Sequence, residues 1–371
     1  MTENLIIGGG VYGCALAWAL VKRNVGCHLI EAKSIASGAS GGPGRRGVRA
    51  NGRDPREIPL MRQAQALWPT LHETLGADSL FERTGHLLLI ERAEDLAEAE
   101  ARVSLQNQMG IASELLSAGK LRELEPEVGE QVRAAIFCPD DGVADHTATT
   151  CAYAEAARQA GATIEEGLSA RRLVVDGARV VAVEIEDGDP IPVADRLFVL
   201  ANGGARDLLA DRLALPLWSL AFQVLLSVPL DAVPIRHLVG HAHRTLSLKA
   251  EAGNRVMISG GRLGHWDHET RSGATIESEV AANVADAVAV YPSLEGLEIE
   301  RADAGHLEAL SLDGVPIIDR LPGLENAYVG TGWCGHGWAI APAVAELLAD
   351  WTPEGKRPAP LAPFACSRFG V

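Results

Sequence analysis

The chain has 371 residues, and its 33 Lys and Arg against 49 Asp and Glu give a formal net charge of −16. Hydrophobic residues make up 47% and charged residues 22%, which is typical of a globular protein and excludes a disordered or fibrous chain. The length predicts two domains, or one large domain with insertions. Because an acidic surface repels phosphate backbones, the charge argues against nucleic acid as the main partner.

Cysteine usage and hydropathy indicate the cellular compartment. The six cysteines form no CxxC pair and no metal-ligand spacing, so we expect reduced thiols. No run of about 18 apolar residues is present, which predicts no membrane span. The first apolar run, Leu5–Ile7, begins after only four residues and leaves no room for a signal peptide. We therefore expect a cytoplasmic protein.

The N-terminal segment carries the strongest motif. Leu5–Ile7 predicts a short strand, and a GxGxxG sequence at residues 8–13 follows it at once. The Ala-rich stretch 14–21 predicts a helix. Residues 27–30 predict a second strand that ends in Glu31, eighteen residues after the last glycine of the motif. The order is therefore strand, glycine-rich turn, helix, strand and acid.

Each part of this unit suits the binding of an adenine dinucleotide. Gly8 permits a tight turn, Gly10 lets the backbone approach a pyrophosphate, and Gly13 allows the helix to pack closely on the strand. The helix N-terminus offers free N–H groups and the positive end of its dipole to the phosphates. The Glu31 carboxylate can accept hydrogen bonds from ribose hydroxyls. The alternative, a glycine-rich turn in an unrelated α/β protein, does not account for all these parts together.

The rest of the chain does not continue as alternating strands and helices, as a nicotinamide-dependent enzyme would need to complete its parallel sheet. A small-residue loop at 34–44 is followed by the cationic stretch Arg45–Arg49. The later predicted elements are a helix at 56–75, a hairpin with strands at 173–175 and 180–185, a strand at 197–200 that runs into a glycine turn, a strand at 327–330, the glycine-rich turn 331–337 and a helix at 341–351. The last turn is suited to hold another polar or anionic part of a long cofactor.

These segments together resemble the FAD-dependent oxidoreductase family of D-amino acid, glycine and sarcosine oxidases. They are most similar to its sarcosine-oxidase-like secondary-amine oxidases, which include iminodiacetate oxidase-like proteins. The matching segments occur in order from residue 4 to about residue 351, and they are the GxGxxG unit with Glu31, Ser37-Gly38-Ala39-Ser40, Leu200-Ala201-Asn202-Gly203, Leu312-Asp313-Gly314-Val315-Pro316 and Gly335-His336-Gly337. The motifs are specific for the family and much less so for the substrate.

The resemblance implies an α/β fold in which a discontinuous, Rossmann-like FAD-binding domain is interleaved with a substrate domain built on an antiparallel sheet. We assign residues 1–81, 144–215 and 308–371 to the FAD-binding domain, and 82–143 and 216–307 to the substrate domain. Within the substrate domain the sequence predicts strands at 224–228, 245–248 and 256–259 and a helix at 280–290.

FAD is the cofactor that the resemblance implies. Monomeric sarcosine oxidases attach their flavin through a cysteine near the position of His306, and because no cysteine lies there, we expect non-covalent FAD. Cofactor contacts are expected from the residues that match the family's binding segments: Gly8, Gly10, Val11, Tyr12, Gly13, Glu31, Ala32, Ala39, Ser40, Arg45, Arg46, Gly47, Val48, Ala170, Ala201, Gly203, Gly335, His336, Gly337 and Trp338.

Amino-acid oxidation needs a cationic clamp for the substrate carboxylate, and Arg suits this role because its fork binds bidentately. Sarcosine-oxidase-like proteins carry two Arg three positions apart beside the flavin and the substrate, and Arg46 and Arg49 have that spacing. The resemblance places His336 in a turn against the flavin ring. The alternatives are solvated arginines in a basic loop and a histidine that only packs or caps a helix.

The chain departs from the family at two positions. Ala339 stands where monomeric sarcosine oxidase carries a cation that helps to hold the carboxylate. Lys249 or Arg262, each at the end of a predicted strand, could supply that charge or promote the reaction with oxygen, although exposed cations are common at such places. Glu308 stands where glycine and D-amino acid oxidases carry a substrate-binding arginine, which separates the chain from those enzymes. No metal is predicted, because the spacing of His241, His243, His265 and His268 matches no standard site.

We therefore interpret the chain as an FAD-dependent oxidoreductase that oxidises the C–N bond of a small secondary-amine amino acid, an N-substituted glycine such as sarcosine or iminodiacetate. Oxygen or another acceptor would take the electrons from the flavin. Three alternatives stay open: a D-amino acid or D-proline-type dehydrogenase of the same fold, an oxidase of 2-hydroxy acids, and a non-catalytic flavoprotein subunit. The sequence leaves the oligomeric state open.

Overall fold

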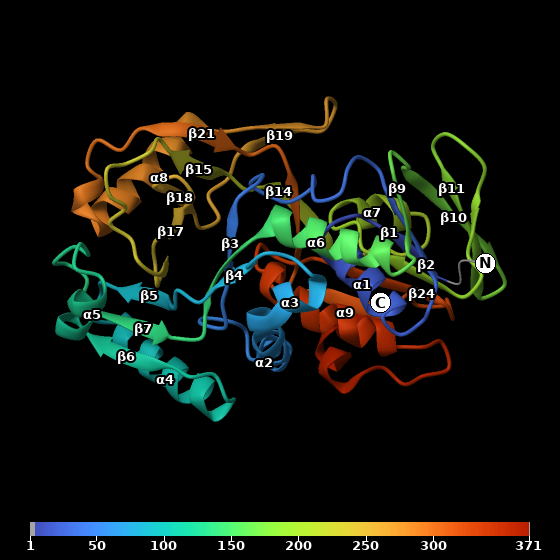
Figure 1. Ribbon diagram of the computed structural model, residues 1–371, viewed down its shortest axis with the longest axis horizontal. Coiled ribbons are helices and arrows are strands. Elements are labelled where there is room, and N and C mark those ends of the chain that lie inside the picture. Colours follow the sequence, from blue (N-terminus) through green and yellow to red (C-terminus); the bar gives the residue numbers. More distant parts are fainter. Residues whose placement is uncertain (1–3, 371) are drawn as a thin grey trace.

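Two large β-sheets organise the computed structural model, which describes residues 4–370 (Figure 1). The six-stranded sheet has the order β23-β24-β13-β1-β2-β9, and its strands run parallel except for β23, which pairs antiparallel with β24. This arrangement confirms the predicted Rossmann-like sheet. The strands are β1 (Asn4–Ile7), β2 (Cys27–Glu31), β9 (Thr163–Glu166), β13 (Arg196–Val199), β23 (Ile317–Arg320) and β24 (Ala327–Thr331).

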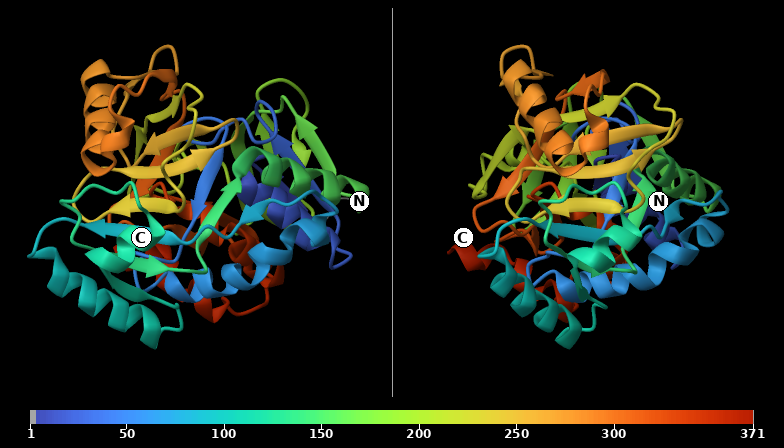
Figure 2. Two further views of the ribbon diagram at one scale, coloured as in Figure 1. Left: turned by 60° about the vertical axis from the view of Figure 1, so that its left-hand side comes forward. Right: turned by 90° about the vertical axis from the view of Figure 1, so that its left-hand side faces the viewer.

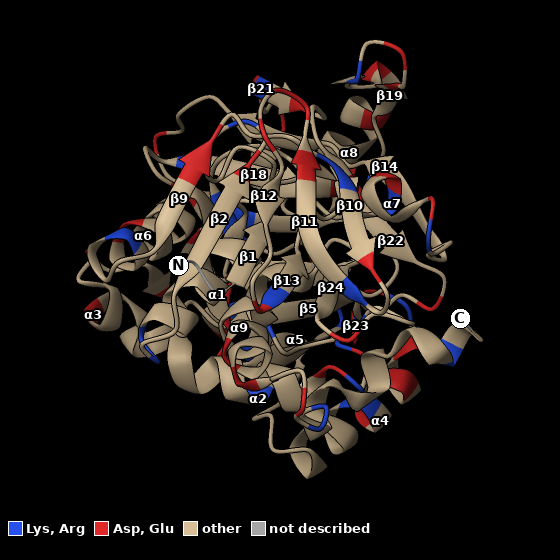
Figure 3. Cartoon of the chain, turned by 90° about the vertical axis from the view of Figure 1, so that its right-hand side faces the viewer, with Lys and Arg blue, Asp and Glu red and all other residues tan. Residues whose placement is uncertain are grey.

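Both faces of this sheet are covered, because its side chains alternate between the two sides. Ile6 packs in the core cluster that contains α1 (Val11–Val21) and α9 (Ala341–Asp350). Its neighbours Leu5 and Ile7 pack on the opposite face, where the hairpin β10–β11 (Ala170–Asp176 and Arg179–Ile185) and α7 (Gly204–Leu209) lie. In Figure 3 the central strands are free of charged residues along their length, and the charges lie at strand ends.

The eight-stranded sheet has the order β21-β15-β18-β17-β16-β5-β7-β6. All its pairs are antiparallel except β16–β5, which is parallel. The predicted antiparallel sheet is therefore confirmed except for the pair β16–β5. These two strands lie far apart in the sequence, so no hairpin turn forces them to run antiparallel. Figure 2 shows strands from these separate segments side by side. They are β5 (His86–Ile90), β6 (Glu114–Ser117), β7 (Ala134–Cys138), β15 (Val224–Ser227), β16 (Leu238–His241), β17 (Ser247–Glu251), β18 (Arg255–Ser259) and β21 (Ile299–Asp303).

The two faces of the eight-stranded sheet have different partners. Leu248 and Ile258 point into a core cluster shared with α5 (Ala118–Leu124) and α8 (Glu277–Val290). Met257 and Glu251 alternate with residues of that cluster and contact β3 (Arg45–Val48), since the Glu251 Oε2 atom accepts a hydrogen bond from the Arg45 N–H at 2.7 Å. The side chains of Arg46 and Lys249 lie between β3 and this face.

The helix predicted over 56–75 is interrupted. It consists of α2 (Ile58–Leu67), a 3₁₀ turn (Trp68–Thr70) and α3 (Leu71–Leu75). Pro69 accounts for the break, because proline lacks the N–H that would continue the helical hydrogen bonds. The remaining elements are β4 (Phe81–Glu82), α4 (Asp95–Gln108), β8 (Gly142–Asp145), α6 (His146–Gln159), β12 (Ile191–Pro192), β14 (Leu217–Ala221), β19 (His265–Asp267), β20 (Ser272–Ala274), β22 (Leu307–Ser311) and 3₁₀ turns at Pro292–Leu294, Gly337–Ile340, Ala359–Phe364 and Cys366–Phe369.

Three sequence expectations bear on this architecture. The domain boundaries at 81/82 and 307/308 fall inside β4 and β22, so these positions are not natural ends, and the division into domains stays a prediction. Within residues 4–370, no helix has the length and apolar character that a membrane crossing requires. All six cysteines are free thiols.

Candidate active site

The turn between β1 and α1 has the form that a pyrophosphate requires. Gly8 has a φ of +114°, and a Cβ on Gly13 would lie 1.9 Å from the Gly8 carbonyl oxygen, so neither position admits a side chain. A Cβ on Gly10, in contrast, would meet no heavy atom within 4 Å. The helix α1 starts there without a side-chain cap or an acidic residue in its first turn. Its N–H groups are therefore available to an anionic ligand.

Glu31 is fixed beside this turn. Its Oε2 accepts a hydrogen bond from the Gly9 N–H at 2.6 Å, and its Oε1 accepts one from the Lys33 N–H at 2.8 Å. Each carboxylate oxygen keeps a further lone pair, which suits ribose hydroxyls. The exposed Ala32 follows directly. Ala170 lies close by, because the nearby Leu168 N–H donates to the Glu31 carbonyl at 2.9 Å. These residues fit the adenosine half of an FAD molecule.

Two further glycine turns are joined by Glu308. The Gly335 N–H donates to its Oε1 at 2.8 Å, and the Asn202 side-chain amide donates to its Oε2 at 3.3 Å. Asn202 lies between Ala201 and Gly203 with a φ of +45°. Burial raises the pKa of Glu308 to about 7. The Glu308 carboxyl therefore connects the turns after β13 and β24.

Aromatic residues tie the first glycine turn to the last. The Tyr12 hydroxyl donates to the Gly337 carbonyl at 2.5 Å, and its ring stacks on Trp333 with centroids 3.6 Å apart. Val11 precedes Tyr12 in the first turn of α1 and is half-buried. The Trp338 indole N–H is buried without a hydrogen-bond partner among the described residues, so it remains available to a ligand. This unsatisfied donor, like the open space over Gly10, fits a bound cofactor.

Arg46 holds the small-residue loop in place. Its Nη2 donates to the carbonyls of Ser40, at 3.2 Å, and Gly42, and its Nη1 donates to the Arg45 carbonyl at 3.0 Å. Burial lowers its pKa to about 10. The loop residue Ala39 lies beside Ser40, while Gly47 and Val48 complete β3. Arg45 itself is turned outward, where it forms an ion pair with Glu82 at 2.8 Å.

Arg49 is the least satisfied cation of the site. It donates one hydrogen bond, from Nη1 to the Asn51 carbonyl at 2.6 Å, and no carboxylate oxygen of residues 4–370 lies within 4.0 Å of its guanidinium nitrogens. Burial, followed by the positive charge of Arg53, lowers its pKa to about 10. The buried Asp141 fixes the chain just beyond Arg49, since its carboxylate accepts the Ala50 N–H at 2.7 Å and the Asn51 N–H at 3.0 Å.

Lys249 lies within a strand rather than at its end. The strand expected at 245–248 is β17 at Ser247–Glu251, so Lys249 occupies its centre and is only 3% exposed. Its Nζ donates to the Ser259 hydroxyl at 3.3 Å. Burial, and then the charge of Arg46, lower the pKa of Lys249 to about 7. The side chain therefore faces β3, and the expectation of a strand-end position is corrected.

Arg262 belongs to the other face of the eight-stranded sheet. Its Nη1 pairs with Glu279 at 2.9 Å and its Nη2 with Asp286 at 2.6 Å, both on α8. Because α8 packs on the face opposite to Lys249, and because two carboxylates already occupy this guanidinium, we do not place Arg262 in the substrate clamp. This candidate from the sequence is withdrawn.

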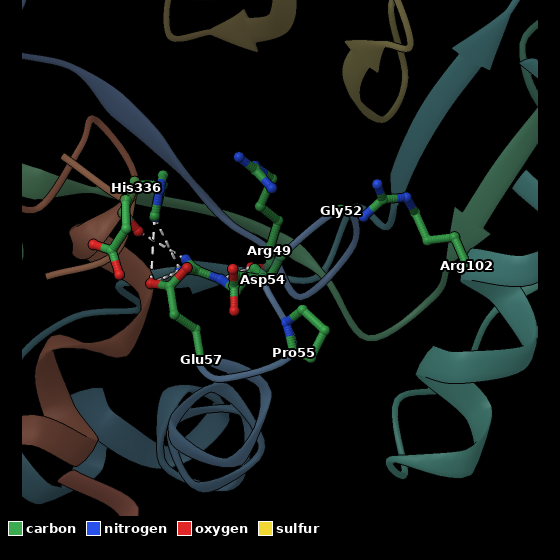
Figure 4. Close-up of a pocket in the computed structure, with 10 residues that line it drawn as sticks. Arg49, Gly52, Asp54, Pro55, Glu57, Arg102 and His336 are labelled. Carbon is green, nitrogen blue, oxygen red and sulfur yellow. Dashed lines mark hydrogen bonds and ion pairs between the residues drawn. The ribbon is translucent and has the colours of Figure 1, made fainter. Parts of the chain in front are cut away.

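His336 joins a buried ion pair that sequence reasoning missed. Its Nδ1 lies 3.3 Å from Glu57 Oε1, and Glu57 pairs with Arg53 at 3.1 Å (Figure 4). Arg53 also donates to the carbonyls of Arg49, at 2.7 Å, and His336, at 2.8 Å. Burial raises the pKa of Glu57, but Arg53 and His336 outweigh it and the net pKa is lowered. The only sequence signal was the i,i+4 spacing of Arg53 and Glu57, which usually marks a solvated helix face.

Two further histidines near the site carried no sequence signal. His86, on β5, is buried, its Nδ1 has no hydrogen-bond partner among the described residues, and burial followed by the charge of Arg49 lowers its pKa well below the usual value. His146, the first residue of α6, lies with its ring 5.8 Å from that of Trp338. Burial lowers its pKa to about 4.

A cluster of Glu91, His241 and His243 lies away from these residues and has the ligand types of a metal site. Its hydrogen bonds argue for an ion-pair network instead. The His241 Nδ1 atom accepts the N–H groups of His243 and Arg244 at 3.2 and 3.1 Å, so its Nε2 carries the proton and cannot ligate a metal. Both carboxylate oxygens of Glu91 bind Arg244. His265, on the β19–β20 hairpin, is not part of this cluster.

The family model of FAD dependent oxidoreductases, abbreviated DAO, matches residues 4–351, and the chain belongs to this family. It is thus an FAD-dependent oxidoreductase that acts on amino acids or amines. Over 378 residues it is 27% identical to sarcosine oxidase subunit beta of an Arthrobacter species, which covers 98% of this chain and 90% of that protein. It is 25% identical over 374 residues to glycine oxidase of Geobacillus kaustophilus, with 98% and 96% covered.

A solved structure supports the same assignment. L-proline dehydrogenase from P. horikoshii superposes with a TM-score of 0.90 at 25% identity, and the match covers 100% of this chain and 98% of that one. The predictions of FAD as cofactor and of an amino-acid or amine oxidoreductase are confirmed at family level. The roles of the individual site residues stay predictions.

Proposed function

We propose that this protein oxidises a small secondary-amine amino acid of the N-substituted glycine type, such as sarcosine or iminodiacetate. The observation that carries the proposal is that three cations, the buried Lys249 and the partly buried Arg46 and Arg49, lack a carboxylate partner in the described chain. No carboxylate oxygen of the described residues lies within 4.0 Å of their charged nitrogens. Buried charges are costly unless paired. A substrate carboxylate would supply the missing negative charge.

The three cations have different freedom to act. Arg46 donates hydrogen bonds to the carbonyls of Ser40 and Gly42, so its role is to hold the loop that carries Ala39 and Ser40. Among the described residues, Arg49 uses one of its five N–H donors, so it can bind a carboxylate bidentately. Lys249 adds a positive charge from β17, either for that carboxylate or for the negative charge that develops when oxygen is reduced.

The redox chemistry belongs to the cofactor. Bound FAD supplies the acceptor for a hydride from the carbon next to the amine nitrogen, while the nitrogen loses a proton, and we propose oxygen as the final acceptor with hydrogen peroxide as its product. The imine that results reacts with water to give an amine and an aldehyde or glyoxylate. The chain's contribution is to orient the substrate C–H by its carboxylate and to exclude water.

A second candidate is a dehydrogenase for proline. The similarity to L-proline dehydrogenase favours it, and proline is itself a secondary-amine amino acid with one carboxylate that Arg49 could hold. The two candidates differ in the substrate, which is cyclic only for the dehydrogenase, and in the electron acceptor, which is oxygen only for the oxidase. A non-catalytic flavoprotein subunit is a further alternative.

Anaerobic bleaching of the flavin absorption tests these proposals. The holoenzyme is mixed with sarcosine, iminodiacetate, glycine, L-proline, D-proline, D-alanine and a 2-hydroxy acid, and air is then admitted to measure peroxide. Bleaching by the N-substituted glycines with peroxide release is expected. Bleaching only by a proline, with little peroxide, would instead establish the dehydrogenase, and bleaching by no amine would overturn both.

The Arg49→Gln variant tests the clamp itself. Losing a bidentate charge-assisted contact is expected to raise KM for the amino acid by about 10-fold or more. Arg83→Gln is the matched control, because Arg83 forms an exposed ion pair with Asp140. Equal kinetics for Arg49→Gln and the control would remove Arg49 from the substrate site.

A further inference from the structure

A cavity of about 410 Å³ is lined in part by Arg49. One wall is the loop from Gly52 to Glu57, and the others are formed by Arg102 of α4, His336 and the turn Asp313–Gly314. In Figure 4 the Arg102 side chain reaches from α4 toward Gly52, so the guanidinium groups of Arg49 and Arg102 both lie at this cavity. The positive charge of Arg102 also lowers the pKa of Arg49.

Each of the three carboxylates that line the cavity, Asp54, Glu57 and Asp313, is paired with an arginine. Glu57 is neutralised by Arg53. Asp54 and Asp313 are both bound by Arg56, at 2.9 and 2.6 Å, and Asp313 is bound by Arg368 as well. Of the three lining arginines, Arg49 and Arg102 are not paired with a carboxylate that lines the cavity. Arg49 has no carboxylate partner among the described residues, and Arg102 pairs only with Glu98, whose side chain is 71% exposed.

We propose that this cavity binds a second carboxylate of the substrate, so that the preferred substrates are dicarboxylic secondary amines, in which the nitrogen carries two carboxyalkyl groups. The inference rests on the proposed function and narrows its substrate class. Arg49 holds the carboxylate next to the reacting carbon, and Arg102 holds the distal one. A monocarboxylic substrate leaves the charge of Arg102 without a substrate partner inside the cavity.

Arg102 is free to make this contact. Exposed ion pairs contribute little, so the bond to Glu98 can be exchanged for a substrate carboxylate at small cost. A substrate carboxylate held at the cavity would be attracted by the positive charge of Arg49 as well as by that of Arg102.

Binding of unreactive acids to the holoenzyme tests the proposal independently of turnover. Glutarate has the chain length of iminodiacetate with carbon in place of nitrogen, and butyrate is its monocarboxylic counterpart. Their dissociation constants are measured by the perturbation of the flavin absorption spectrum and by calorimetry. Glutarate is expected to bind about 10-fold more tightly than butyrate, as a charge-assisted contact predicts. Arg102→Gln should remove this difference, with the affinity for butyrate unchanged.

Glu98→Gln separates binding by Arg102 from a structural role of its ion pair. If Arg102 binds the distal carboxylate, Glu98→Gln keeps or increases the preference for glutarate, because it frees the guanidinium. If the ion pair only stabilises α4, both variants lose the same affinity, and the proposal is wrong. It is equally wrong if the wild-type protein binds glutarate and butyrate alike.

The outcome for the proposed function is read separately, from the bleaching assay. If sarcosine and iminodiacetate both reduce the flavin and Arg102→Gln changes neither KM, the function stands and the second carboxylate site falls. If no amine reduces the flavin, the function falls, and a selective, Arg102-dependent affinity for glutarate would still establish a dicarboxylate site.

Discussion

The ion pair of Arg53 and Glu57 should contribute strongly to stability, because both side chains are only 1% exposed. Replacing Glu57 by Gln keeps the shape and removes the negative charge. Arg53 then remains as a buried cation next to Arg49, whose pKa it already lowers. Breaking a buried pair in this way costs about 3–5 kcal/mol. Gln can still accept one hydrogen bond from Arg53, so we expect a loss of about 3 kcal/mol in the free energy of unfolding.

Removing both charges should be less harmful than removing one. In the double variant Arg53→Met with Glu57→Leu, no charge is left buried, and the main loss is that of the two hydrogen bonds from Arg53 to the carbonyls of Arg49 and His336. At about 1.5 kcal/mol each for bonds from a charged donor, these amount to about 3 kcal/mol, which the burial of the two new apolar side chains offsets in part. The single substitution is therefore expected to be the more destabilising of the two.

Urea unfolding followed by tryptophan fluorescence and circular dichroism measures both effects. Arg172→Gln serves as the control, because it breaks a comparable but exposed pair with Glu184 and should leave the unfolding midpoint nearly unchanged. A Glu57→Gln midpoint equal to that of the wild-type protein, or a double variant less stable than the single one, would refute the reasoning.

Three further predictions follow from the structure. Gly10→Ala should fold normally, because its Cβ would meet no protein atom within 4 Å. In a fluorescence titration this variant should bind FAD about 10-fold or more weakly. Gly119→Ala is the control, because its Cβ is equally unobstructed and remote from the turn, and it should bind FAD normally. Lys249 has a pKa of about 7 in the folded chain against about 10.5 when unfolded. Between pH 7 and 10.5 the unfolded state therefore binds more protons, so the stability that Lys249 contributes rises with pH by up to about 1.4 kcal/mol per pH unit. Lys249→Met should remove this rise, while the control Lys120→Met, at an exposed lysine, should keep it. Burial raises the pKa of Asp141 to about 6 from about 3.8. Between these two pH values the folded state binds more protons than the unfolded state, so the stability that Asp141 contributes falls as the pH rises from about 4 to about 6. In Asp141→Asn the midpoint of urea unfolding should therefore depend less on pH across this range.

Features that depend on residues close in the sequence could be predicted. The glycines at 8, 10 and 13 and Glu31 lie within one strand–helix–strand unit, so their spacing alone predicted the turn and the acid that the structure contains. The hairpin at β10–β11 and the helix before the C-terminal tail were predictable for the same reason. The break at Pro69 was also readable from the sequence and was missed.

The partners of charged side chains could not be predicted, because tertiary packing decides them. Lys249 and Arg262 were equivalent candidates in the sequence, each a cation near a strand end. Strand alternation in the folded sheet turns Lys249 toward β3, while the loop after β18 brings Arg262 to the carboxylates of α8. The predicted strand stopped at residue 248, three residues before the end of β17, so Lys249 was taken as a strand-end residue and its burial was missed.

Net charge and site charge are set by different parts of this chain. The formal charge of −16 lies mostly on exposed carboxylates, and many of the arginines are paired with them. The site takes its sign from Arg46, Arg49 and Lys249, which have no carboxylate partner in the described chain. Arg46 and Lys249 come together because β3 packs on the Lys249 face of the eight-stranded sheet. An acidic surface would slow the approach of an anionic substrate, but the cationic site would retain it once bound. Raising the salt concentration should therefore increase the association rate of a dicarboxylate while weakening its final affinity, and stopped-flow measurements on glutarate can separate the two.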